Sequence, residues 1–400
     1  MIIFANRAHY SAIGGVENSI RSLAKETSKR QIPAMIVCRE ALDNESLDAD
    51  ASRLSTGIKL LTYKDDVDSN PLLRLVYLCH GGYTLKKVYR DLYHKYPTAD
   101  IIARHHAHVL AAHSAGFKKI CYLVPSLSAT QLQHELTGAN LFRQLRLRLH
   151  ILIDGAVQRR SLKFSKLFVF SQPMKDAVIA QLPKSPASQN VSLVRPGIAR
   201  TRFIPPTTSE KVELKTRLGL PIDRPLFLFV GRFVQAKGLG FVVEALSQIA
   251  TDCGAVLVGD GERKAAVKSQ ITTLGLDRRV RVDDATSRVE DYYRACDVFV
   301  MSSTYEPFGQ TILEAVACGL RVVAFHRSTG VKTATHELGL DAAIDYAYQL
   351  DADGLAQAME RALVKLSDGC YAPEVLGQMG GHDRVINAYS WSVLLDQLLE

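Results

Sequence analysis

Short apolar runs alternate with longer amphipathic stretches along the whole chain, and this rhythm limits the possible fold more than any other feature. The runs are rich in Val, Ile, Leu and Phe and lack polar alternation, which indicates strands buried on both faces of a parallel sheet. Helices are predicted between them, for example at Val16–Arg30, Gly238–Ile249 and Thr311–Cys318. Repeated strand–helix units predict a doubly wound α/β fold. The predicted strands are Ile2–Ala5, Ala34–Cys38, Ile58–Tyr63, Asp100–Ala103, Lys119–Val124, Lys166–Ser171, Val191–Val194, Leu226–Val230, Ala255–Gly259, Val280–Val282, Val298–Met301, Arg321–Phe325 and Ala342–Asp345.

A break between two domains is readable near Arg195–Ser209, which holds three prolines and one glycine before a new strand–helix series starts at Leu226. A chain of 400 residues also suits two domains of ordinary size. We therefore predict two facing Rossmann-like domains, at 1–197 and 198–384, with a helix at 385–400 that completes the first. Because open α/β sheets bind ligands at the carboxyl ends of their strands, the predicted site is a cleft between the domains.

The charge is distributed unevenly between the two halves. Residues 1–200 carry 28 Lys and Arg against 15 Asp and Glu, whereas residues 201–400 carry 21 against 26. The basic half is expected to meet an anionic partner, and no nucleic-acid partner is predicted. The stretch 140–166 holds seven cations and one acidic residue, and the pattern of LFRQLRLRLHILI within it fits helix or strand. It is either a basic amphipathic surface beside anionic lipid or a core helix with a solvated basic face.

Several classes of protein are disfavoured by what the sequence lacks. Seven scattered cysteines without a CxxC pair indicate reduced thiols, and no stretch approaches the ~20 apolar residues of a membrane span, so we predict a cytoplasmic protein. Gly259-Asp-Gly261 has no third glycine, which argues against a nicotinamide dehydrogenase. No metal is predicted: the histidines at 105, 106, 108 and 113 need not converge, and the DxD patterns at 48–50 and 351–353 lie in a polar loop and at a helix start.

Two segments of the second half carry the chemistry. In the first, a buried strand ends at Gly231 and is followed by Arg232, Lys237 and a helix, and cations at such a strand end favour a diphosphate site. In the second, SSTYEPFGQTILEAVACG places Glu306 in a turn after a strand and Glu314 in the following helix. Carboxylates there can accept hydrogen bonds from sugar and ribose hydroxyls. The alternatives are solvated cations and an ordinary carboxylate at a helix start.

The combination of GRFVQAKG, LVGDGE and YEPFGQTILEAVACGLRVVAF resembles the retaining family 4 glycosyltransferases, which have the GT-B architecture. The first half is similar in weaker form, through Gly14-Gly15-Val16-Glu17, the serine at 171 and VRPGIARTRF at 194–203. SWSVLLDQLL resembles the closing helix of the family. The resemblance implies a nucleotide-diphosphate sugar as donor substrate, no cofactor and no metal, and a glycan or lipid-linked acceptor.

The resemblance also implies roles for individual residues. Arg232 and Lys237 would hold the donor diphosphate, Glu306 would bind the transferred sugar and Glu314 the ribose. His105 would be the cleft histidine near the reacting sugar, with His106 as the competing assignment. The remaining donor contacts would come from Phe308, Gly309 and Gln310, and from the backbone at Gly14 and Gly15 beside the phosphates.

The chain departs from the family pattern at Arg195, at Arg321 and at 328–331, where STGV replaces a double glycine. The resulting hypothesis is retaining transfer in bacterial surface polysaccharide or glycolipid synthesis, with the second domain binding the donor. A catalytically silent nucleotide- or glycan-binding partner of a glycosyltransferase complex is the main alternative, because of the altered segment. An epimerase or dehydrogenase of Rossmann type is a further alternative, disfavoured by the incomplete glycine motif.

Overall fold

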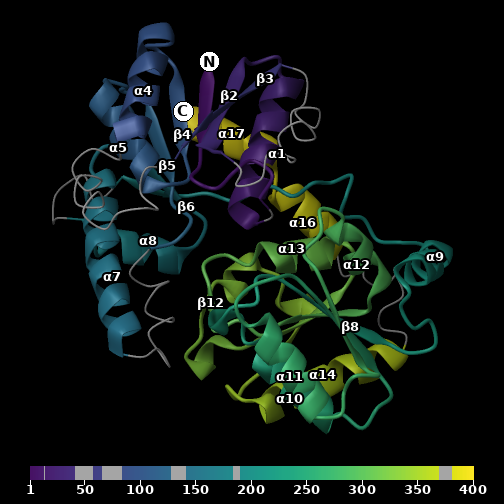
Figure 1. Cartoon of the computed structure of the whole chain (residues 1–400). Helices are drawn as coiled ribbons and strands as arrows, with labels where there is room; N and C mark the ends of the chain where they lie inside the picture. The colour runs from purple at the N-terminus through teal and green to yellow at the C-terminus, as the bar shows by residue number, and fades with distance from the viewer. Residues whose placement is uncertain (13, 41–56, 65–82, 128–140, 183–189, 369–380) are drawn as a thin grey trace. The chain divides into compact units, whose positions relative to one another are not determined.

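The computed structural model of the chain describes residues 1–12, 14–40, 57–64, 83–127, 141–182, 190–368 and 381–400. The chain divides into two compact units (Figure 1), one comprising Met1–Gly197 with Trp391–Glu400, the other Ile198–Ser390. Each unit contains a parallel sheet with helices packed on it, which confirms the predicted α/β class with two Rossmann-like domains. The predicted helix at 385–400 is instead the end of one helix, Gly381–Ala388, and a second helix, Trp391–Leu399, and only the second belongs to the first unit.

The first unit is built on a seven-stranded parallel sheet with the order β3-β2-β1-β4-β5-β6-β7. Side chains of β1 alternate between its faces, so that Ile2 and Phe4 enter one core and Ile3 and Ala5 the other. The chain order reverses between β1 and β4, a place where such sheets bind ligands. The strands are β1 Ile2–Ala5, β2 Ala34–Arg39, β3 Ile58–Tyr63, β4 Asp100–Ala103, β5 Ile120–Leu123, β6 Lys166–Val169 and β7 Val191–Leu193.

Helices cover both faces of this sheet. The core that contains Ile3 and Ala5 lies under α4 and α5, and the core that contains Ile2 and Phe4 lies under α1 and α17. The stretch whose pattern fitted helix or strand is a helix, α7, although most side chains of its first ten residues lie outside the described part of the structure. The helices are α1 Gly15–Lys29, α4 Tyr83–Lys95, α5 His106–Ala115, α7 Leu141–Ser161, α8 Gln172–Ile179 and α17 Trp391–Leu399.

Helix α17 belongs to the first unit, although it follows the whole second unit in sequence (Figure 1). Its buried leucines, Leu394, Leu395 and Leu398, join the core formed by β1, β2 and α1. At its surface the Arg30 guanidinium bonds the Asp396 carboxylate. The apolar face of α17 therefore fills a part of the first core that residues 1–197 leave open.

The second unit has a six-stranded parallel sheet with the order β10-β9-β8-β11-β13-β15, and a separate two-stranded pair, β12-β14. Its core joins the sheet to α10, α11 and α14. The strands are β8 Leu226–Val230, β9 Gly254–Val258, β10 Val280–Asp283, β11 Val298–Met301, β12 Tyr305–Glu306, β13 Arg321–Phe325, β14 Lys332–Thr333 and β15 Ile344–Ala347. The α-helices are α9 Thr208–Leu218, α10 Leu239–Gln248, α11 Lys264–Thr273, α12 Val289–Ala295, α13 Gln310–Ala317, α14 Ala352–Ser367 and α16 Gly381–Ala388, and 3-10 turns lie at η2 Gln235–Lys237, η3 Arg327–Thr329, η4 Thr335–Leu338 and η5 Asp341–Ala343.

Arg321, a departure from the family pattern, has a structural role at the start of β13. Its guanidinium Nε and Nη2 each lie 2.9 Å from Asp345 Oδ2 in β15, and its Nη1 donates to the Ala342 carbonyl at 2.9 Å. Both side chains are buried, and Lys365 of α14 bonds the other oxygen of Asp345. Because the carboxylate is almost fully removed from water, its charge depends on these cations.

We expect Arg321→Met to lower the free energy of unfolding of the second unit by on the order of 3 kcal/mol, since it leaves Asp345 buried with only Lys365 as a partner. Scanning calorimetry measures this change. Arg288→Met removes a mostly exposed cation whose partner, the buried Asp291, keeps a second ion pair with Arg217, and should change stability by less than about 1 kcal/mol. An Arg321→Met protein as stable as the control would show that the buried pair is not stabilising.

Candidate functional site

Lys237 and Glu306, 69 residues apart, form an ion pair in the second unit. Lys237 ends the 3-10 turn η2 after β8, and Glu306 ends the short strand β12 after β11. Both side chains are largely buried, with 19% and 16% of their surface exposed. The structure therefore brings two of the predicted site residues together at the carboxyl edge of the sheet.

The loops that carry this pair are held to each other by backbone contacts. Ser302 Oγ donates to the Lys237 carbonyl at 2.8 Å, and the Thr304 amide donates to the Ala236 carbonyl at 2.9 Å. Gly238 has φ of +64°, and a Cβ atom there would overlap the Ser302 carbonyl oxygen. Any other residue at 238 would push the two loops apart, which explains the glycine after Lys237.

Arg232 lies beside this pair in sequence but differs from it in surroundings. Its side chain is exposed, and within the described ranges no ion pair engages it. Its loop rests on the segment after β9, where the Phe233 amide donates to the Asp260 carbonyl at 2.8 Å. Gly259 has φ of +154°, and a Cβ atom there would collide with the Gly231 carbonyl oxygen. The motif Gly259-Asp-Gly261 thus supports the Arg232 loop, a role that the sequence did not reveal.

Glu314 lies inside α13, apart from the Lys237–Glu306 pair, and is 8% exposed. Burial raises the pKa of its carboxyl to about 7, while the Tyr293 hydroxyl and the Arg202 charge act in the opposite direction. This group is therefore close to half protonated at neutral pH. Its ionised form only accepts hydrogen bonds, whereas its protonated form also donates one, so the charge of Glu314 changes which hydroxyl groups it can bind.

The residues that begin α13 have different environments. Gly309 is the N-cap and has φ of +95°, a left-handed conformation that favours glycine. Gln310 is the first helical residue and is half-buried. Phe308 is 8% exposed, and its ring lies 6.1 Å from the Tyr389 ring. The Phe308 side chain is thus part of the unit's packing.

In the first unit, Gly14 and Gly15 open α1 at the carboxyl edge of the sheet. Gly14 is the N-cap in an extended conformation, and the Glu17 carboxylate lies where a Cβ atom of residue 14 would be. Asn6, which follows β1, donates to Glu17 Oε1 at 2.8 Å. The positive end of the helix dipole at the start of α1 stabilises the Glu17 carboxylate. The sequence analysis placed the donor phosphates at this same helix end.

His105 and His106 follow β4 and are stacked, with ring centroids 4.1 Å apart. His105 caps α5, accepting the Ala107 amide on Nδ1 at 3.3 Å, and stays partly exposed. Its pKa is held well below the usual range by burial and by the neighbouring His106, so that it is neutral. His106 is buried, and its Nε2 lies 3.0 Å from Asp154 of α7. Of the two candidates, His105 is the one that a ligand can reach.

His108 is fully buried and has a structural environment. Its ring nitrogens lie 3.1 Å from the Tyr63 hydroxyl and 3.0 Å from the Tyr89 hydroxyl. Burial lowers the pKa of His108 to about 3. Across the described residues, no group of three or more His, Cys, Asp and Glu side chains is arranged to hold a metal ion, and no helix is long and apolar enough to cross a membrane.

Arg104 is a residue that sequence reasoning missed. It directly follows β4 and is 4% exposed, and its Nε and Nη1 are buried without a hydrogen-bond partner. The signal for it in the sequence was a cation immediately after a buried strand, where an apolar or small residue would be expected. Its guanidinium carbon lies 5.2 Å from the centre of the Phe170 ring, which follows β6.

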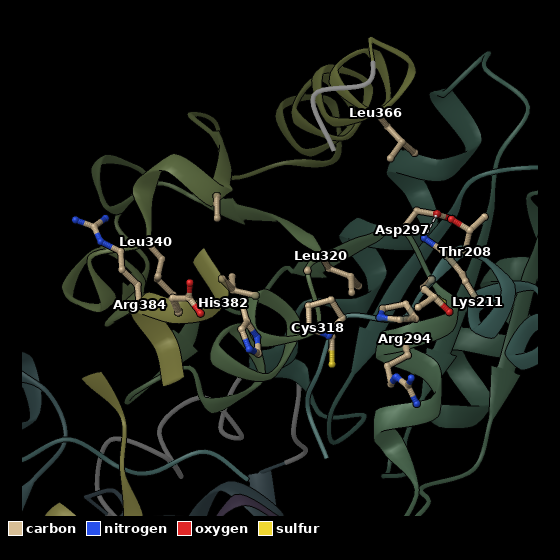
Figure 2. Close-up of a pocket in the computed structure, with 18 of the residues that line it drawn as sticks. Thr208, Lys211, Arg294, Asp297, Cys318, Leu320, Leu340, Leu366, His382 and Arg384 are labelled. Carbon is tan, nitrogen blue, oxygen red and sulfur yellow. Dashed lines mark ion pairs between the residues drawn. The ribbon is translucent and has the colours of Figure 1, made fainter. Parts of the chain in front are cut away.

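The second unit also contains a cavity of about 320 Å³ that is not the predicted donor site. It lies at the amino ends of β11 and β13, next to Asp297 and Leu320, whereas the Lys237–Glu306 pair lies at the carboxyl edge. Figure 2 shows Lys211 and Asp297 paired on one side and His382 on the other. His382 Nδ1 lies 2.7 Å from the Ala317 carbonyl, which explains its position without a ligand.

Two parallel-sheet units and cations at a strand-end edge define a GT-B type of glycosyltransferase fold, and solved structures agree. HepE of Anabaena, solved with UDP and glucose, superposes with a TM-score of 0.73 at 18% identity, over 100% of this chain and 98% of that one. WaaG, described as a glycosyltransferase of lipopolysaccharide biosynthesis, superposes with a TM-score of 0.72 at 15% identity, over 99% and 98%. At such identities the likeness establishes the fold.

Residues 210–364, which make up most of the second unit, match the family model "Glycosyl transferases group 1". D-inositol 3-phosphate glycosyltransferase of Xylanimonas cellulosilytica is 36% identical over 143 residues, 34% of each chain. The lipopolysaccharide core biosynthesis glycosyltransferase LpsE of Rhizobium meliloti is 31% identical over 186 residues, 46% of this chain and 52% of that protein. The chain thus spans a third to about half the length of these relatives.

The raised pKa of Glu314 predicts a pH-dependent stability. Between about pH 4.5 and 7 the folded state holds a proton that the unfolded chain has released, so the free energy of unfolding falls as pH rises through this range. Glu314→Gln removes this titration. The stability of the wild type relative to Glu314→Gln should fall by up to about 1.4 kcal/mol per pH unit.

Calorimetry at pH 5, 6 and 7 measures this difference. Glu244→Gln, at an exposed carboxylate of α10, is the control and should follow the wild type. A constant difference between wild type and Glu314→Gln over this range would contradict a protonated Glu314.

Proposed function

We propose that the protein is a retaining glycosyltransferase that moves a sugar from a nucleoside diphosphate sugar to a glycan or lipid-linked acceptor. The observation that carries the proposal is the Lys237–Glu306 ion pair, beside the exposed Arg232, at the carboxyl edge of the second sheet. All three residues lie in the segment that matches the group 1 family model. Two cations and one carboxylate suit a diphosphate joined to a hydroxyl-rich sugar.

In this proposal the second unit binds the donor. Arg232 donates to the diphosphate in the forked geometry that its guanidinium favours, and Lys237 acts as a compact positive charge held in place by Glu306. Glu306 has a second oxygen for a sugar hydroxyl. Glu314 binds the ribose in its ionised form, so nucleotide affinity should increase as pH rises through about 7. Gly309 and Gln310 supply backbone and side-chain contacts at the start of α13.

The chemical step replaces one bond with another on the same face of the sugar. The bond from the anomeric carbon to the diphosphate oxygen breaks, the bond to the acceptor oxygen forms, and the acceptor proton passes to the leaving phosphate. Arg232 and Lys237 stabilise the negative charge that develops on that phosphate. Such electrostatic stabilisation of the transition state is usually the largest single contribution to catalysis. Because these side chains supply the positive charge, the proposal needs no metal ion.

We propose that the first unit binds the acceptor, with His105 at the edge of its sheet, and that the backbone at Gly14 and Gly15 contacts the donor phosphates. Relatives named for lipopolysaccharide core biosynthesis support a surface polysaccharide or glycolipid as the product. Contact of the basic stretch 140–166 with anionic lipid stays a prediction from charge. Residue 140 and most side chains of 141–150 lie outside the described part of the structure.

One observation favours the second candidate, a silent partner that binds a nucleotide or glycan. The segment that replaces the double glycine begins in the 3-10 turn η3, whose N-cap His326 has its Nδ1 2.8 Å from Ser328 Oγ. Residues 328 and 329 carry side chains where the family pattern has glycines. Nucleotide binding without transfer to any acceptor of a broad panel would favour this candidate.

We expect Lys237→Met to reduce transfer by about 100-fold or more and to weaken binding of the nucleoside diphosphate, because a cation facing the leaving group is lost. Binding is measured by thermal shift against a panel of nucleoside diphosphates, with and without EDTA, and transfer by release of the diphosphate.

Lys211→Met is the matched control. Lys211 is also paired with a carboxylate, Asp297 at 2.6 Å, but lies at the amino edge of the same sheet. It should keep wild-type nucleotide binding. Equal binding and transfer by wild type and Lys237→Met would sink the assignment, and a response that EDTA abolishes would contradict metal independence.

A further inference from the structure

Arg104 is a buried cation whose hydrogen bonds are incomplete. Arg104 is 4% exposed, and among the described residues its buried Nε and Nη1 have no hydrogen-bond partner. Burial lowers the pKa of Arg104 to about 10, so it is charged at neutral pH. Buried charged groups are normally paired, because an unpaired one costs several kcal/mol.

The surroundings of Arg104 do not neutralise it. The carboxylate whose charge acts most on it is Glu17 in the first turn of α1, but among the described side chains the pair is not within ion-pair distance, and Glu17 accepts from Asn6. The Phe170 ring provides a flat apolar face 5.2 Å from the guanidinium carbon. The Tyr122 hydroxyl is a neutral neighbour at this pH, since burial raises its pKa.

The position of Arg104 in the fold is that of a ligand-binding residue. Its amide donates to the Ala5 carbonyl at 2.8 Å, so it stands at the end of β4 beside the end of β1, where the chain order of the sheet reverses. Helices α1 and α5 begin at the same edge, and their amino ends favour negative charge. A free guanidinium fork at such an edge matches two oxygens of one anionic group.

We propose that Arg104 binds an anionic group of the acceptor, a phosphate or a carboxylate. The inference rests on the proposed function, in which the first unit binds the acceptor. The acceptor is then a charged sugar or lipid phosphate rather than a neutral glycan. The same oxygen chemistry is present in the donor diphosphate, so the test must separate the two sources.

The probe is inorganic phosphate, with acetate as the carboxylate probe and chloride at equal ionic strength as the reference. Thermal unfolding is followed by the fluorescence of Trp391, the single tryptophan, which lies in the first unit. We expect phosphate or acetate, at several times its Kd, to raise the melting temperature of the wild type by about 2–4 °C. Arg104→Gln should lose this response, and Arg104→Lys should keep part of it.

Two variants locate the anion. Arg90→Gln removes an exposed cation of α4 and should respond like the wild type. Arg232→Gln removes the proposed donor cation and should also keep the response to phosphate. If Arg232→Gln abolishes it and Arg104→Gln does not, the anion binds in the second unit and the proposal is overturned, while the proposed function stands. No response in the wild type overturns it as well.

Nucleoside diphosphates form the second arm. Arg104→Gln should bind them with wild-type affinity, and an equal loss of diphosphate and phosphate binding would assign Arg104 to the donor and overturn the proposal. Failure of the wild type to bind any nucleotide would remove the proposed function, whereas the phosphate response of Arg104 would still be measured independently.

A structural role for Arg104 is tested by stability alone. Arg104→Met replaces an unpaired buried cation with an apolar side chain of similar length, so the melting temperature in phosphate-free buffer should rise. A lower melting temperature would show that Arg104 is held in place for packing, and would overturn the proposal.

Discussion

The loop after β8 and the loop after β11 are fastened to each other, and the geometry of the proposed donor site depends on that contact. Backbone hydrogen bonds and the close approach of Gly238 to Ser302 fix the separation of the loops, and the Lys237–Glu306 pair closes it. A lysine has four rotatable bonds and loses entropy when it is held in one place. Because the fold holds Lys237 before any ligand arrives, that entropic cost is met during folding rather than during binding.

Much of this arrangement was predictable because parallel strands buried on both faces leave a plain trace in sequence. Runs such as Leu226–Val230 and Val298–Met301 coincide with strands, because helices cover both faces of such a sheet and leave no face for polar side chains. The pairing of Lys237 with Glu306 was less accessible. Both were assigned to the site, but only the fold shows that two loops 69 residues apart meet.

The missed features share a physical cause, since they depend on contacts between segments distant in sequence. In the sequence, Arg321 was only a departure from the family pattern, whereas in the fold it pairs with Asp345 of the neighbouring strand. The packing of the Phe308 ring near Tyr389 was also not predicted. The sequence marked Arg104 only as a cation after a buried strand, because whether its nitrogens find hydrogen-bond partners depends on its neighbours in the fold.

Helix α17 sets an order on the synthesis of the protein. A multidomain chain usually folds its amino-terminal domain first as it leaves the ribosome. Here the core of the first unit needs Leu394, Leu395 and Leu398, which are translated only after the entire second unit. Until α17 is made, the apolar surface of β1, β2 and α1 against which it packs stays uncovered. The nascent first unit must therefore wait, partly folded, while its neighbour is made, and this interval is when chaperones have most to protect.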